Sequence, residues 1–171
     1  MQQTDEVEDR VRADIRQHGW HVVLVPPERD SPGWAHTIGL WERYRHPELL
    51  IFGSEPPQLA ELLNALGERV RAGRRFTAGD DEAGLLPGLG FAFRAMAPRW
   101  VGVFLGNAAW HYRSESIPVL QGFWPDSKGR FPWHTDCTRA VADEQPQLEA
   151  AELHLALPER LLAALRRDGA L

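Results

Sequence analysis

WHVVLVPPERDSPGWAHTIGL, residues Trp20 to Leu40, is the stretch of sequence that decides the fold. Its two ends, WHVVLVP and WAHTIGL, are rich in β-branched and aromatic residues, which favour extended strands. The intervening PERDSPG contains the prolines, glycine and charged residues that are typical of a turn. The sequence therefore predicts that residues 20–26 and 34–40 form an antiparallel hairpin.

Further strands are predicted on the C-terminal side of this hairpin. Short apolar segments lie at residues 48–53 (ELLIFG), 91–98 (FAFRAMAP) and 117–125 (IPVLQGFWP). Residues 77–90 (TAGDDEAGLLPGLG) contain glycines, acids and a proline, which predicts a surface loop. Residues 100–106 (WVGVFLG) fit either a continuation of the preceding strand or the start of another element.

Helical patterns flank these strands. Apolar residues recur every four positions in residues 6–17, and an apolar stripe in residues 58–72 follows a helix-opening pair of prolines. Residues 107–114 are compatible with a short helix, and a C-terminal helical extension is expected at about residues 145–171.

The fold class follows from the order of these elements. Strands grouped as hairpins, with helices spaced unevenly between them, favour an α+β fold over a repeating βαβ unit. We expect one domain over residues 1–171, with a mixed, mainly antiparallel sheet and flanking helices. With 171 residues, of which 43% are hydrophobic, the chain is long enough to bury one sizeable core.

Composition indicates a cytoplasmic protein. No apolar run approaches the roughly 20 residues that cross a bilayer, and the charged N-terminus lacks the apolar centre of a signal peptide. The single cysteine agrees with a reducing compartment. A formal net charge of −5, with scattered arginines, argues against a nucleic-acid partner. We expect neither nucleic acid nor a membrane as partner.

The common catalytic and cofactor motifs are absent from the sequence. It contains no Walker A loop, no G-x-S-x-G, no H-E-x-x-H and no C-x-x-C, so it identifies no cofactor and leaves enzymatic activity open. Cys137 follows His134 and Asp136, but local spacing of this kind is not typical of a catalytic Cys–His pair.

A metal site is a weak alternative near the hairpin. If the second and third strands are neighbours, His36, His46 and Glu48 would approach one another, and such a set is one that a divalent metal uses. The favoured interpretation is structural, with His36 hydrogen-bonded in a strand and His46 in a loop.

Tryptophans at strand ends and turns predict a binding site. Trp34 opens the second hairpin strand, and Trp124 and Trp133 bracket the DSKGR turn. Asp126 and Arg130 would present a carboxylate and a guanidinium between these aromatic walls, which suits a small polar ligand. The favoured structural interpretation is an Asp126–Arg130 ion pair that only closes the turn.

Five segments of the chain also resemble a known family. In order and spacing, HGW, HTIGL, HPELLIFG, LLNALGERVRAG and LQGFWPDSKGRFPW are similar to the bacterial domain-of-unknown-function family 4262 (DUF4262), over roughly residues 17–133. The resemblance implies no activity and no cofactor. At the position of His36 the family usually has an aromatic residue such as tyrosine, which weakens a metal-ligand role for His36. The family pattern falls on Gly19, Trp20, Thr37, Gly39, Leu40, Pro47, Glu48, Asn64, Trp124, Asp126, Gly129, Arg130, Pro132 and Trp133.

Three classes of function remain. The first is a module that binds a small molecule or a protein, with a possible homodimer. Its site would combine the tryptophan-flanked turn with the HTIGL strand, and we expect Trp34, His36, Thr37, Glu48, Trp124, Asp126, Arg130 and Trp133 to take part. The second is a hydrolase-like enzyme that uses Asp126, Glu48 or His36 as acid or base. The third is an immunity or regulatory partner of another protein.

Overall fold

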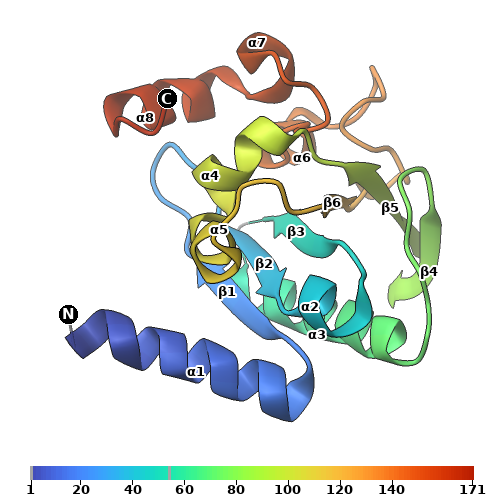
Figure 1. The fold of residues 1–171 in the computed structure, drawn as a ribbon. Coiled ribbons are helices and arrows are strands. Elements are labelled where there is room, and N and C mark those ends of the chain that lie inside the picture. Colours follow the sequence, from blue (N-terminus) through green and yellow to red (C-terminus); the bar gives the residue numbers. More distant parts are fainter. Residues whose placement is uncertain (1, 54) are drawn as a thin grey trace.

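A computed structural model describes residues 2–53 and 55–171. Its centre is a six-stranded sheet with the strand order β1-β2-β3-β6-β5-β4 (Figure 1). Four of the five neighbouring pairs are antiparallel, and β3 and β6 are parallel. The predicted α+β fold with a mixed, mainly antiparallel sheet is confirmed. The strands are β1 (His21–Val25), β2 (Trp34–Ile38), β3 (Glu48–Phe52), β4 (Asp81–Leu86), β5 (Leu89–Ala95) and β6 (Val119–Phe123).

The predicted hairpin forms one end of this sheet. Strands β1 and β2 pair from His21↔Ile38 to Val25↔Trp34, and a short bridge between Glu28 and Ser31 closes the connecting loop. Strand β1 lies at the edge of the sheet and contacts α1, the helix that precedes it (Figure 1).

The helices are α1 (Gln2–His18), α2 (Leu40–Tyr44), α3 (Pro56–Arg71), α4 (Val101–Phe104), α5 (Gly106–Tyr112), α6 (Arg139–Glu144), α7 (Leu153–Ala156) and α8 (Glu159–Arg167). Helices α1, α3 and α5, and helices α7 and α8 of the C-terminal extension, confirm the predicted helical segments with bounds that differ by a few residues, whereas α2 and α6 were not predicted. Among the residues described, no helix has both the length and the apolar character needed to cross a membrane.

Side chains alternate between the two faces of the sheet along each strand, and both faces are covered by other elements. In β3, Leu49 and Ile51 pack against α3, whereas Leu50 and Phe52 join a second core on the opposite face. That second core includes residues of α1, α4 and the C-terminal segment. The sheet therefore lies between α3 and a mixed layer of helices (Figure 1).

Helix α3 is held against the hairpin by one tryptophan. The indole Nε1 of Trp20 donates a hydrogen bond to Asn64 Oδ1 at 3.0 Å. The ring lies so close to the helix that a Cβ at Gly67 would be 2.5 Å from Trp20 Cε2. Gly67 is therefore required for this close packing.

The C-terminal extension is part of the core. Leu148, Leu157, Leu161 and Leu165 are all buried in the cluster that covers the second face of the sheet. The extension therefore completes the domain and is not an independent appendage.

Two local predictions need correction or completion. Residues 77–90 are not only a loop, because Asp81–Leu86 forms the edge strand β4, which pairs with β5. The glycines supply positive φ at Gly84 and Gly88, which allows the chain to bulge and then to turn tightly. Residues 100–106 start helical structure, because Pro98 opens a 3₁₀ turn that leads into α4.

Candidate functional site

Glu48 is a buried carboxylate that holds the start of α2. Its Oε1 accepts hydrogen bonds from the backbone N–H groups of Gly39 (2.9 Å) and Trp41 (3.1 Å). The hydroxyl of Tyr112 also donates to Oε1 at 2.5 Å, and Thr37 Oγ1 donates to Oε2 at 2.6 Å. Burial and the neighbouring Glu48 carboxylate raise the pKa of Tyr112, so its hydroxyl stays protonated. The side chains of Thr37 and Glu48 therefore both have structural roles.

The two histidines of the weak metal hypothesis are also committed to structure. His36 is buried, its Nδ1 lies 3.2 Å from the Thr37 carbonyl, and burial lowers its pKa to about 4. His46 donates from Nδ1 to the Pro47 carbonyl and accepts at Nε2 from the Phe76 N–H, and burial lowers its pKa. Within residues 2–53 and 55–171, no group of three or more histidine, cysteine, aspartate or glutamate residues is arranged to hold a metal ion.

Asp126 organises the turn after β6 in a way that differs from the expected ion pair. Its Oδ1 accepts from the backbone N–H groups of Lys128 (2.9 Å) and Arg130 (3.0 Å), and its Oδ2 accepts from Thr138 N–H at 3.1 Å. These hydrogen bonds lower the pKa of Asp126. The Arg130 side chain instead pairs with Asp136, at 3.2 Å between Nε and Oδ2.

The predicted tryptophans have different environments. Trp34 donates from Nε1 to the Phe104 carbonyl at 2.9 Å, and Trp124 donates to the Phe52 carbonyl at 2.7 Å, so both fasten elements of the core. Trp133 stacks on Phe131 with ring centroids 4.9 Å apart, under the guanidinium of Arg94 at 3.7 Å. Trp133 also lines a cavity of about 630 Å³.

Two of the predicted acid–base candidates, Glu48 and Asp126, lie at different positions along the strand direction of the sheet. Strands β3 and β6 are parallel, with Glu48 opposite Val119. Phe123, the last residue of β6, lies about 13 Å along the strand from Val119, at a rise of roughly 3.3 Å per residue. Asp126 lies beyond Phe123. The structure therefore does not bring Glu48 and Asp126 together, and the binding role of the predicted residues stays a prediction.

Burial and nearby acids also act against a nucleophilic cysteine. Desolvation, followed by the charges of Asp126 and Asp136, raises the pKa of the Cys137 thiol. A raised pKa reduces the fraction of reactive thiolate.

A different set of polar side chains meets in a cavity between α1, β1 and α5. This cavity, which we call the imidazole cavity, has a volume of about 320 Å³. None of its lining residues is acidic or is a lysine or arginine. They are Val7, Val11, His21, Val22, Val23, Leu24, Asn107, Trp110 and His111.

Two histidines in this cavity are each oriented by a carboxylate outside it. His21 Nδ1 lies 2.6 Å from Asp14 Oδ2, so α1 orients the first residue of β1. His111 Nε2 lies 3.0 Å from Glu42 Oε2, so α2 orients a residue of α5. Only 17% and 11% of the His21 and His111 side chains are exposed, so both imidazoles are held within the wall.

Helix α5 supplies three of the lining residues from one face. Asn107, Trp110 and His111 are spaced i, i+3 and i+4, which places them side by side on a helix. Tyr112, the next residue, donates to the buried Glu48. The Glu48 hydrogen bonds therefore fix the helix that carries two of the three polar side chains of the cavity, Asn107 and His111.

The outer wall of the imidazole cavity is apolar and accessible. Val7 is 57% exposed, Leu24 43% and Trp110 46%. Exposed apolar residues that gather at a concave surface are typical of binding sites.

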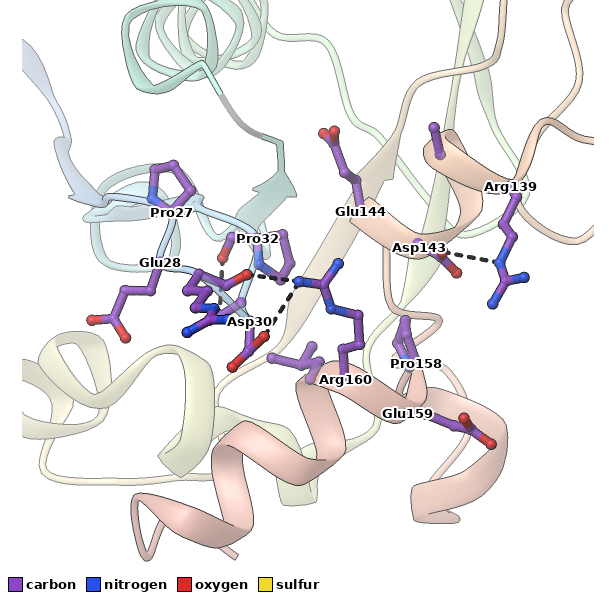
Figure 2. A pocket seen from close by; sticks show the side chains of 14 residues that line it. Pro27, Glu28, Asp30, Pro32, Arg139, Asp143, Glu144, Pro158, Glu159 and Arg160 are labelled. Atoms are coloured by element: carbon purple, nitrogen blue, oxygen red, sulfur yellow. Dashed lines mark hydrogen bonds and ion pairs between the residues drawn. The ribbon is translucent and has the colours of Figure 1, made fainter.

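A second cavity, of about 460 Å³, lies between the β1–β2 loop, α6 and α8. Figure 2 shows Arg160 reaching from α8 towards Asp30, with Arg139 beside Asp143 on α6. Arg160 Nη2 lies 3.3 Å from Asp30 Oδ1 and donates to the Arg29 carbonyl at 2.9 Å. These contacts connect the C-terminal helix to the hairpin loop, so we interpret this cavity as a structural junction.

Sequence reasoning missed His21, Asn107 and His111. One local signal was available, because the N-x-x-W-H pattern in residues 107–111 places polar and aromatic groups on one face of a predicted short helix. Nothing local connects that helix with His21, since the two meet only through tertiary packing.

Comparison with known proteins identifies the family. A family model described as "Domain of unknown function (DUF4262)" matches residues 14–138. The match covers more than half of the chain, so the chain belongs to this family and the predicted resemblance is confirmed. Neither the curated proteins nor the solved structures contain a match to the chain.

Proposed function

We propose that this DUF4262 protein is a binding module for an uncharged small molecule, which occupies the imidazole cavity. The observation that carries the proposal is that His21 and His111, each oriented by its own carboxylate, line the same apolar cavity. The proposed site differs from the one predicted from the sequence, because it contains Trp110 and none of Trp34, Trp124 and Trp133.

The dimensions and composition of the cavity support this function. Its volume of about 320 Å³ lies at the lower end of the range of roughly 300–1,000 Å³ for small-molecule pockets. An apolar wall with a few fixed polar groups is the usual composition of such pockets. Here Val11, Val23 and Trp110 supply the wall, and two imidazoles and the Asn107 amide supply the polar groups.

The charge of the lining residues selects the class of ligand. Since none of them is a lysine, arginine, aspartate or glutamate, an ionic group in the ligand would find no opposite charge in the wall. A neutral compound with an aromatic or aliphatic body and a carbonyl group matches both parts of the cavity. The carbonyl would lie near the imidazoles and the amide, and the body near Trp110.

The first test uses 2-phenylacetamide, which has an aromatic ring and a neutral carbonyl group. Saturation-transfer NMR and tryptophan fluorescence would be recorded during a titration, with phenylacetate as the charged counterpart. We expect a dissociation constant of about 1 mM for the amide, equivalent to about −4 kcal/mol, and weaker binding of the acid.

Matched variants locate the binding. Trp110→Ala should weaken binding of the amide at least tenfold, whereas Trp41→Ala, on α2, should leave it unchanged. Equal affinity in the two variants, or no binding of the amide at all, would contradict the proposed function. Native mass spectrometry of the same samples would count the subunits and test the possible homodimer.

Trp133 is a second candidate site, for a protein segment. Its ring lies between Phe131 and the Arg94 guanidinium, beside a cavity of about 630 Å³. Aromatic and arginine side chains of this kind are enriched at protein interfaces. If this surface binds a partner, Trp133→Ala should abolish capture of that partner in a pull-down, while Trp110→Ala should not.

A further inference from the structure

We propose that the imidazole cavity hydrolyses uncharged carboxylic esters, with His21 as general base and His111 as general acid. This inference rests on the proposed function, because the ester must first bind in the cavity. It extends that function from binding to a reaction and names the substrate class.

The carboxylates determine which nitrogen of each ring is available. An ionised carboxylate only accepts hydrogen bonds, so the ring nitrogen that faces it carries a proton. Asp14 therefore places the proton of His21 on Nδ1 and leaves Nε2 as an acceptor. Glu42 holds the Nε2 proton of His111, so Nδ1 is the available nitrogen. Neither available nitrogen has a hydrogen-bond partner among the residues that the structure describes.

Each imidazole has one nitrogen held by a carboxylate and the other available, so one ring can act as base and the other as acid, and we assign the base to His21. A histidine with Nδ1–H held by a carboxylate and Nε2 available has the arrangement of a general base in acyl-transfer enzymes. His111, when doubly protonated, presents Nδ1–H as a donor while Glu42 balances its charge. The pair thus provides one acceptor and one donor in a single cavity.

Asn107 provides the third group that ester hydrolysis needs. It precedes His111 by one helical turn, so both side chains lie on the same face of α5 and line the cavity. Its side-chain NH₂ is a neutral donor, and such amides stabilise the oxyanion of acyl-transfer intermediates.

The reaction balances with water as the only co-reactant. His21 Nε2 takes a proton from water while the water oxygen bonds to the ester carbonyl carbon, and the carbonyl electron pair moves to the oxygen near Asn107. When this pair returns, the bond between carbon and the alcohol oxygen breaks, and His111 Nδ1 gives its proton to the departing oxygen. One ester and one water become one carboxylic acid and one alcohol. His21 then releases a proton to solvent and His111 takes one up.

The surroundings favour this reaction over two alternatives. A phosphodiester would bring a negative charge into a wall without lysine or arginine. A proton shift within the substrate would benefit from exclusion of water, but Val7 and Trp110 are about half exposed at the mouth. An open cavity without lysine or arginine, in which the Glu42 carboxylate balances the charge of a protonated His111, is better suited to a neutral substrate that reacts with water.

The test compares methyl phenylacetate with 2-phenylacetamide in the full-length protein. NMR would follow the formation of phenylacetate from the ester, and the amide would report binding without rapid reaction. We expect hydrolysis above the buffer rate, with kcat lowered about 100-fold in His21→Gln and in His111→Gln. Because the imidazoles also lie beside the bound carbonyl, the dissociation constant of the amide should rise in each variant, but by less than about tenfold, since glutamine keeps a hydrogen-bonding side chain at the same place.

Further variants separate catalysis from folding. Asp14→Asn should lower kcat but leave KM nearly unchanged, because Asp14 is a positioning residue that acts through the tautomer of His21. Asn107→Ala should lower kcat about 100-fold. His154→Gln, at an exposed position of α7, is the matched control and should retain the full rate. Thermal unfolding of each variant would confirm that it is folded.

The outcomes distinguish the two proposals. Binding of the amide without hydrolysis of the ester by the unmodified protein would overturn the esterase inference and leave the binding function intact. Hydrolysis that persists in both histidine variants would also overturn it, because another group would then carry the reaction. If the unmodified protein does not bind the amide, both proposals are wrong.

Discussion

Replacement of His36 by phenylalanine should make the free energy of unfolding of this protein less sensitive to acid. His36 is buried on β2, and burial lowers its pKa to about 4 from the ordinary value of about 6.5. Between these values the unfolded chain binds a proton at this residue and the folded protein does not. The free energy of unfolding therefore decreases as the pH falls from about 6.5 to about 4.

The size of the effect follows from the two pKa values. At pH 7.5 the difference in proton binding at His36 is negligible, and at pH 5.0 it costs the folded state about 2 kcal/mol. Below pH 4 the cost levels off at about 3 kcal/mol, because both states are then protonated. Phenylalanine fills a similar space without binding a proton.

Urea unfolding at pH 7.5 and pH 5.0 measures this difference. The unfolding free energy of His36→Phe minus that of the unmodified protein should be about 2 kcal/mol larger at pH 5.0 than at pH 7.5. All other residues are the same in both proteins, so their contributions to the pH dependence cancel. His36→Tyr should show the same change. If the difference between variant and unmodified protein is the same at both pH values, His36 is not held neutral by burial and the reasoning is wrong.

Three other substitutions test the scaffold around the cavity. Glu48→Ala should reduce the unfolding free energy by about 3–5 kcal/mol, measured by urea unfolding, since it leaves several buried donors without an acceptor. Gly67→Ala should cost about 1–3 kcal/mol in the same assay, because its methyl group would overlap the Trp20 ring, and an unchanged midpoint would refute the close contact. Asp126→Ala should speed limited proteolysis in the segment after β6, because three backbone donors lose their acceptor, while Asp136→Ala should have a smaller effect.

Local patterns were sufficient to predict most of the fold. Residues 20–40 predicted the hairpin correctly, because alternation and turn residues act over short distances. The same rules failed for residues 77–90, where the glycines that indicate a loop instead allow a bulged edge strand. Pairing with β5 outweighs the weak strand preference of this segment.

The candidate site was less predictable, because residue type alone does not show where a side chain lies. Trp34 and Trp124 stood at strand ends, which suggested an exposed wall, but each donates its indole N–H to a core carbonyl. Asp126 and Arg130 do lie in one turn, yet the carboxylate binds backbone N–H groups and the guanidinium takes another partner. Which polar group pairs with which is decided by three-dimensional distances of a few ångströms.

The residues that resemble the family and the residues of the imidazole cavity are connected through one hydroxyl group. Thr37 and Gly39 belong to the family pattern and donate to Glu48, which also receives the Tyr112 hydroxyl. Tyr112 adjoins His111, whose ring lies 4.9 Å from the tyrosine ring. Since the network ends on α5, it sets the position of one of the two imidazoles. The buried carboxylate that first suggested catalysis thus has a structural role, as a support for the helix that carries His111.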